Sequence, residues 1–180
     1  GGNIGVSIGP DGVLMVDNQF LPLAEKIEAA VKKLSPGPLK FMLNTHWHGD
    51  HTGGNENLAA SGAIIIAHDE VRARMSSEQF NEFFQDSTPP SPAGALPVIT
   101  FSDNFSLHVN GDELRGMHVH QAHTDGDVFI HFRRANVIHT GDLMFHGMYP
   151  FIDLDSGGSV DGMIAGVDRI LALADAATRI

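Results

Sequence analysis

The chain has 180 residues, 42% of them hydrophobic, which is ample for one domain with a sizeable core and too few to expect two. Its formal net charge is -11, and this excess of carboxylates disfavours nucleic acid and anionic membrane surfaces as partners. No apolar run approaches about 20 residues, so the sequence predicts no membrane-spanning helix. The lack of cysteine excludes disulfides and thiolate ligands and leaves histidine and carboxylate as the strong metal ligands.

The first segments predict a β-hairpin, a helix and a third strand. Residues 3–8 and 13–16 are apolar, β-branched runs separated by a Gly-Pro-Asp-Gly turn signal. Apolar residues at helical spacing predict a helix from Leu23 to Leu34, and a Pro-Gly-rich turn ends it. A strand from Leu39 to Asn44 follows. This strand–helix–strand unit places the next loop at the carboxyl end of a strand, where layered α/β folds tend to bind ligands.

That loop contains three histidines and a carboxylate within six positions, namely His46, His48, Asp50 and His51. Crowding these groups away from water without a cation is costly, and they are the nitrogen and oxygen ligands that zinc and similar metals prefer. Residues two apart in extended chain point the same way, so His46 and His48 can reach one cation together. Asp50 and His51 lie past the bend at Gly49 and are free to face a second one. The loop therefore predicts two metals.

The next segments predict a short helix over residues 55–60, a strand over 63–67 that is buried on both faces, and a helix capped by His68. From Ser76 to Pro97 the composition shifts towards Ser, Pro, Gln and Phe, and three phenylalanines (Phe80, Phe83 and Phe84) fall at helical spacing. Two interpretations stay open for this segment: a flap beside the pocket, or a surface helix that packs its phenylalanines on the core.

The last third of the chain predicts mainly antiparallel strands. Three of them cover residues 98–101, 105–109 and 113–119, a further pair covers residues 127–132 and 136–139, and an amphipathic helix spans residues 157–177.

The motif His-x-His-x-Asp-His after an apolar strand resembles the signature of the metallo-β-lactamase superfamily. Two further matches occur in the expected order: His123 within Ala122-His-Thr-Asp-Gly126, and Asp142 within Thr140-Gly-Asp-Leu143. The resemblance implies a mixed α/β fold, a four-layer αββα sandwich in one domain over residues 1–180, with the metals at one edge. Members usually continue into a final strand and a loop with one more histidine ligand, so we expect that the sequence lacks this last part of the fold.

The same resemblance implies the ligand sets. His46, His48 and His123 would hold a first Zn²⁺, and Asp50, His51 and Asp142 would hold a second, weaker one. Asp50 would also be catalytic, because it can orient a metal-bound hydroxide and carry its proton to the leaving group.

The function implied by the resemblance is zinc-dependent hydrolysis of a small ester, lactone, thioester or β-lactam. Asp142 stands where class B1 β-lactamases generally carry cysteine and where members of the glyoxalase II and lactonase type carry aspartate. Because Arg133 and Arg134 are expected in a distant turn and the Asp142 loop has no Lys, a substrate carboxylate has no obvious cationic anchor, so any β-lactamase activity should be weak or promiscuous. Two alternatives stay open: a mononuclear iron dioxygenase of the persulfide type, and a metal-binding domain without activity. The expected partner is a small-molecule substrate, and the compartment is left open between periplasm and cytoplasm.

Three further polar residues are candidates for a supporting role. His120, Asp127 and His146 flank the third ligand or Asp142 and could contact ligands or line the pocket, although surface positions are an equal alternative for the histidines. Trp47, between two ligands, is expected to pack rather than bind substrate. Asp153 is expected to be a turn residue.

Overall fold

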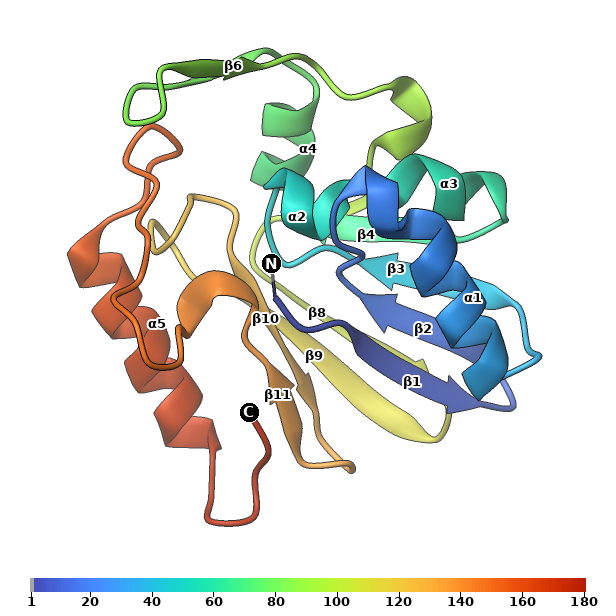
Figure 1. Cartoon of the computed structure of the whole chain (residues 1–180). Coiled ribbons are helices and arrows are strands. Elements are labelled where there is room, and N and C mark those ends of the chain that lie inside the picture. The colour runs from blue at the N-terminus through green and yellow to red at the C-terminus, as the bar shows by residue number, and fades with distance from the viewer. Residues whose placement is uncertain (1) are drawn as a thin grey trace.

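The computed structural model describes residues 2–180, which form two large β-sheets and a small separate hairpin (Figure 1). The strands of the first sheet, in spatial order, are β1 (Gly5–Gly9), β2 (Gly12–Val16), β3 (Leu39–Leu43), β4 (Ile64–His68) and β7 (Ile99–Phe101). The strands of the second are β11 (Val137–His139), β10 (Val128–Phe132), β9 (Asp112–His118) and β8 (Asn104–Val109).

The first sheet is built as the sequence predicted up to its fourth strand. β1 and β2 form the expected antiparallel hairpin, and α1 (Ala24–Leu34), preceded by a single 3-10 turn, crosses over to the parallel strand β3. The predicted short helix is α3 (Asn55–Ala60), and His68 caps α4 (Asp69–Met75) by accepting a hydrogen bond from Glu70 N. The predicted antiparallel pairing of residues 98–101 with the next strand was wrong. β7 pairs in parallel with β4 and does not pair with β8.

The second sheet is antiparallel throughout, as expected, and lies face to face with the first. Alternate residues of both sheets meet in one apolar layer that contains Leu14, Val16, Leu43, Leu114, Ile130 and Phe132. A second layer packs the first sheet against α1 and α3, and a third packs the second sheet against α5 (Val160–Leu173). Figure 1 shows the result, with α1 and α3 on one side and α5 on the other, which is the predicted αββα sandwich.

The predicted helix at the C-terminal end is shorter than expected. Residues 157–177 were assigned to it, but the structure gives Val160–Leu173. Ser159 begins the helix because its side chain accepts a hydrogen bond from Gly162 N, and Ala174 returns to an extended conformation. Only Met163 and Ile170 of the predicted apolar face are buried, whereas Ile164 and Leu171 are exposed.

The interpretation of Phe80, Phe83 and Phe84 as part of a core-packed helix was wrong. Their segment forms a hairpin of β5 (Gln79–Asn81) and β6 (Asp86–Thr88), and all three rings are exposed. Figure 1 shows this hairpin reaching across the top of the molecule until its tip lies beside the loop that precedes α5. Among residues 2–180, none of the helices has both the length and the apolar character needed to cross a bilayer.

Candidate metal centre

The predicted ligands come from both sheets and meet at one edge of the sandwich. β3 ends at Leu43 and leads into the loop with His46 and His48, and His51 lies in the single-turn helix α2 (Gly49–Thr52). The second sheet contributes His123 from the connection between β9 and β10, and Asp142 from a 3-10 turn after β11. Side chains almost 100 positions apart therefore face one another because strand ends gather at a common edge.

The first group consists of three imidazoles. Nδ1 of His48 lies 3.1 Å from Nε2 of His46 and 2.9 Å from Nε2 of His123. His46 and His123 are each 1% exposed, so both rings are shielded from bulk water. Burial, followed by the charges of neighbouring histidines, lowers the pKa of His46 well below its usual range and that of His123 to about 4. These two rings are therefore neutral near pH 7 and offer lone pairs.

Hydrogen bonds on the far side of each ring decide which nitrogen faces inward. His123 Nδ1 lies 2.7 Å from the carbonyl oxygen of Phe151 and must donate to it. His48 Nε2 donates to Asp153 Oδ2 at 2.8 Å. The Thr45 hydroxyl donates a hydrogen bond to Asp17 Oδ2, so its oxygen accepts one from His46 Nδ1 at 3.1 Å. Each inward nitrogen is then an acceptor, which is an assignment from the hydrogen-bond network.

His51 and Asp142 form the second group together with His46. In each group all ligand atoms lie within 4.8 Å of one another. His51 Nδ1 donates to Asp17 Oδ2 at 2.7 Å, and its Nε2 lies 3.2 Å from Asp142 Oδ1. Asp50 belongs to neither group within residues 2–180, although its Oδ2 lies 3.6 Å from His51 Nε2. Burial opposes a charge on His51, but the charge of Asp17 and the contacts with Asp142 outweigh it and raise the pKa of His51 to about 10. A proton and a cation therefore compete for this nitrogen.

The donor set fits a divalent cation. Three acceptor nitrogens at 2.9 and 3.1 Å from each other repel unless a positive charge lies between them. Nε2 of His51 is buried and has no hydrogen-bond partner among the described residues. Because an unpartnered buried nitrogen is costly, this arrangement indicates a ligand atom of a metal ion. Neutral imidazole with carboxylate is a ligand set that zinc accepts, and other divalent ions accept it too.

Asp17 is a functional residue that the sequence analysis missed. It directly follows β2, is 1% exposed, and has φ of 60°, a conformation that Asp tolerates better than most residues. Its carboxylate accepts hydrogen bonds from Thr45 N, Thr45 Oγ1 and His51 Nδ1. It therefore orients His51 directly and His46 through the threonine hydroxyl. The sequence offered one signal for Asp17, since it is a carboxylate that directly follows an apolar strand, all of whose residues are buried.

Asp153 is the second missed residue, since it was expected to be only a turn residue. It is 1% exposed, and besides His48 Nε2 it accepts hydrogen bonds from Ser156 Oγ at 2.6 Å and Asn81 Nδ2 at 3.3 Å. Burial alone would raise the pKa of Asp153, but the contacts with His48 and Ser156 outweigh it and lower the pKa to about 2. Trp47 packs, as expected, beside Met75 and donates from Nε1 to Ser156 Oγ.

The three candidate supporting residues have different positions. Asp127 accepts hydrogen bonds of 2.7 Å from both Thr124 N and Thr124 Oγ1, and so fixes the turn that contains His123. Burial raises the pKa of Asp127 to about 7. His120 and His146 are exposed. A role for either histidine at the pocket stays a prediction.

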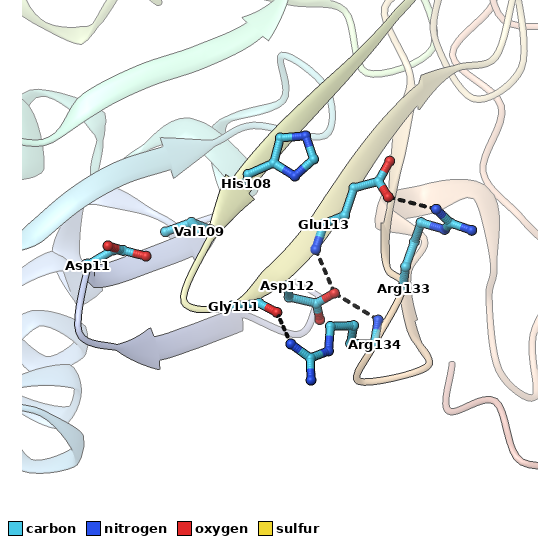
Figure 2. A pocket seen from close by; sticks show the side chains of 8 residues that line it. All are labelled: Asp11, His108, Val109, Gly111, Asp112, Glu113, Arg133 and Arg134. Atoms are coloured by element: carbon cyan, nitrogen blue, oxygen red, sulfur yellow. Dashed lines mark hydrogen bonds and ion pairs between the residues drawn. The ribbon is translucent and has the colours of Figure 1, made fainter.

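Two cavities differ in their relation to the centre. One of about 220 Å³ adjoins the ligand loop and is lined in part by Trp47, Gly49 and Thr52. The larger, of about 680 Å³, lies among the turns that precede β2, join β8 to β9 and join β10 to β11 (Figure 2). These turns are at the ends of the strands remote from the four ligand histidines, although His108 lines this cavity. In Figure 2, Arg133 pairs with Glu113 and Arg134 bonds Gly111 O, so both guanidinium groups are already engaged there.

Comparison with known proteins defines the family. The sequence profile of the metallo-β-lactamase superfamily matches residues 3–177, and the chain belongs to that superfamily. An atrochrysone carboxyl ACP thioesterase from Aspergillus terreus is 29% identical over 143 residues, which are 79% of this chain and 38% of that protein. A hydroxyacylglutathione hydrolase from Erythrobacter litoralis is 29% identical over 103 residues, which are 57% of this chain and 33% of the relative.

The fold agrees with solved structures. A metallo-β-lactamase from Pontibacter korlensis superposes with a TM-score of 0.74 at 16% identity, over 93% of this chain and 72% of that one. At this identity the likeness concerns the fold alone. The chain spans about two-fifths or less of the length of these two curated relatives.

Proposed function

We propose that the chain is a metal-dependent hydrolase of acyl compounds, with zinc as the preferred ion and an ester, lactone or thioester as substrate. The observation that carries the proposal is the convergence of four ring nitrogens and the Asp142 carboxylate on one buried edge, with the outer nitrogen of every ring already hydrogen-bonded. A divalent ion bound by these residues would supply a coordinated water of lowered pKa and a positive charge beside the carbonyl group of the substrate.

The protein's own residues have separate tasks in this scheme. His46, His48 and His123 would hold the first ion, and His51 with Asp142 would hold the second. Asp153 keeps His48 in the tautomer that leaves its inward nitrogen unprotonated, and Asp17 holds His51 through Nδ1 so that Nε2 faces the centre. Asp50 has a side chain that is 19% exposed at the mouth of the centre, so it can accept a proton from the nucleophile and pass it to the leaving group.

The charge distribution argues against an anionic substrate. Lys and Arg are absent from residues 76–114 and 135–168. These segments supply the hairpin and the loops around Asp142 and Asp153. Arg133 and Arg134 lie at the remote end of the strands and are paired. Arg74 lines the cavity beside the ligand loop but is paired with Asp125 at 2.6 Å. A β-lactam carboxylate would therefore find no unpaired cationic anchor there or in these segments, so we expect β-lactam hydrolysis to be slow.

The named activities of the two relatives support acyl hydrolysis as the reaction class. A thioesterase and a hydroxyacylglutathione hydrolase both cleave a thioester, and the same centre accepts an oxygen ester in principle because the attacked carbonyl is common to both.

The test is hydrolysis of p-nitrophenyl butyrate and of a neutral butyryl thioester by zinc-loaded protein. We expect turnover that a chelator abolishes and added zinc restores, and a loss of about 100-fold or more in kcat/KM for His123→Ala. His108→Ala is the matched control, because His108 is an exposed histidine of β8 that lines the cavity at the remote ends of the strands. Protein that retains one iron per chain and hydrolyses neither compound would instead favour the dioxygenase alternative.

A further inference from the structure

Three aromatic rings form an exposed cluster beside the candidate metal centre. Phe83 and Phe84 come from the tip of the β5–β6 hairpin, and Phe151 comes from the loop before α5. The ring centroids are 5.0 Å apart for Phe83 and Phe84, 5.6 Å for Phe84 and Phe151, and 6.3 Å for Phe83 and Phe151. Phe83 is 78% exposed and Phe84 61% exposed. Rings that touch each other yet remain this exposed are unusual on a protein surface that binds nothing.

The cluster is continuous with the centre. The carbonyl oxygen of Phe151 accepts the hydrogen bond of His123 Nδ1, and the Phe151 ring lies 5.9 Å from the His123 ring. Phe145 approaches His123 from the loop after Asp142, with ring centroids 6.1 Å apart. An apolar path therefore runs outward from the third ligand to the tip of the hairpin.

Hydrogen bonds fix the hairpin in this position. Asn81 Nδ2 donates to Asp153 Oδ1 at 3.3 Å, and Glu82 N donates to Asp155 Oδ2 at 2.7 Å. Asp153 is also the partner of His48, so one carboxylate attaches the hairpin and orients a ligand. The aromatic rings consequently keep a defined place relative to the centre.

The surroundings of the rings select the kind of ligand. The loop that carries Phe151 has three further exposed apolar residues, Met148, Tyr149 and Leu154, which are 68%, 96% and 74% exposed. Charges nearby are acidic, since Glu82, Asp86 and Asp155 flank the rings and Lys and Arg are absent from residues 76–114 and 135–168. Such a surface attracts an uncharged apolar group and repels carboxylates, phosphates and anionic lipid headgroups.

We propose that Phe83, Phe84 and Phe151 form the binding platform for the apolar acyl group of the substrate, so that the enzyme prefers esters and thioesters with acyl chains of about six carbons or more. The inference rests on the proposed hydrolase function for its reaction and deepens it by naming the substrate class. An acyl carbonyl at the metal centre would leave its chain to run past His123 along Phe151 and onto the hairpin. An open platform covers only one face of the acyl chain, so each added methylene gains about half of the free energy that full burial would give. This corresponds to roughly a twofold gain in kcat/KM per methylene.

The experiment compares p-nitrophenyl octanoate with p-nitrophenyl butyrate, both below their solubility limits, on zinc-loaded wild type and on the Phe83→Ala/Phe84→Ala variant. Four added methylenes, at about twofold each, should give the wild type about a 16-fold higher kcat/KM for octanoate. The double variant should bring this ratio below about threefold. Phe80→Ala is the matched control, because Phe80 is a 52% exposed phenylalanine of the same hairpin that lies outside the three-ring cluster.

A binding measurement separates this inference from the reaction. Titration with the neutral dye N-phenyl-1-naphthylamine should show a Kd about fivefold weaker for the double variant than for wild type and Phe80→Ala. Equal octanoate and butyrate turnover, a ratio retained by the double variant, or unchanged dye binding would each overturn the platform. If neither ester is hydrolysed in a zinc-dependent way, the proposed function fails, and the dye titration alone decides whether the platform exists.

Discussion

His48 and Asp153 are separated by 105 positions in the chain, yet Nε2 of the imidazole donates a 2.8 Å hydrogen bond to Oδ2 of the carboxylate. Because Nε2 carries the proton, Nδ1 is left as the nitrogen that faces His46 and His123. This one contact thus links the loop before α5 to the ligand loop after β3. The carboxylate acts on the metal through the histidine and is a positioning residue.

Asp153→Asn should weaken metal binding by about 10- to 100-fold, the range typical of lost carboxylate support behind a ligand. The amide can donate to His48 Nε2 and so favour the wrong tautomer. Competition with a chromogenic zinc chelator measures the affinity. Asp155→Asn, an exposed carboxylate of the same loop that bonds only the hairpin backbone, should leave the affinity within about twofold. Equal effects of the two substitutions would rule out the orienting role.

Asp17→Asn should cost both stability and metal. Asp17 is buried and accepts three hydrogen bonds, from Thr45 N, Thr45 Oγ1 and His51 Nδ1, so we expect a loss of about 1–3 kcal/mol in the free energy of unfolding. The zinc content per chain should also fall because His51 loses its orienting partner. Urea unfolding and elemental analysis measure the two effects. Asp11→Asn, an exposed carboxylate at the start of the same strand, serves as control, and a similar loss there would argue against the assignment.

His118 predicts a dependence of stability on pH. Burial, together with the charge of His68 stacked on it at 3.8 Å, lowers the pKa of His118 to about 4, against the effect of its bond to the Asp127 carbonyl. His120 also disfavours the charge, and Asp103 favours it. The unfolded chain, with a histidine pKa of about 6.5, binds the proton first, so stability is complete above pH 6.5 and declines as the pH falls towards 4.

The variant His118→Asn isolates this effect, since the amide retains the donor to the Asp127 carbonyl and does not titrate. Between pH 7.5 and pH 5 it should lose less stability than the wild type, by on the order of 1 kcal/mol after allowance for partial exposure. Chemical unfolding at the two pH values gives the comparison. Parallel losses in both proteins would mean that other groups account for the acid sensitivity.

Gly162→Ala should disturb the start of α5. A Cβ at this position would lie 1.8 Å from the carbonyl oxygen of Gln121, a backbone atom two residues before His123. The helix or the ligand turn must move, which should cost more than about 2 kcal/mol in the free energy of unfolding and lower zinc affinity as well. At Gly94 the nearest atom to a new Cβ is 3.6 Å away, so Gly94→Ala should change both quantities little. A neutral Gly162→Ala would contradict the close approach.

Local sequence signals predicted the first elements and the histidine-rich loop, whereas the αββα sandwich and the addition of His123 and Asp142 to the site were implied by the family resemblance. Hairpin, crossover helix and ligand loop follow from turn residues and periodicity within short windows, and strand ends converge at one edge for a general reason. The spacing of Phe80, Phe83 and Phe84 was misleading, because three residues at helical spacing cannot distinguish a helix from a hairpin that exposes them. What fixes the hairpin is the contact between Asn81 and Asp153, and their separation along the chain leaves no local pattern.

The same reason explains the carboxylates that were missed. Asp17 and Asp153 act on histidines 34 and 105 positions away, and neither lies in a motif. The pairing of β7 with β4 was missed because adjacency in sequence favoured β8, whereas the chain changes sheets between Phe101 and Asn104.

The most direct test of the account is the zinc content of the purified chain after equilibration with zinc and removal of the free ion, measured by elemental analysis beside a His46→Ala variant. His46 Nε2 lies within 4.8 Å of the ligand atoms of both groups, so its loss should remove a ligand of the first ion and disturb the neighbouring second site. We predict between one and two zinc ions per wild-type chain, with the second the more easily removed, and well below one in the variant. Less than about 0.1 zinc per wild-type chain, or equal zinc in both proteins, would contradict the metal centre on which the proposed function depends.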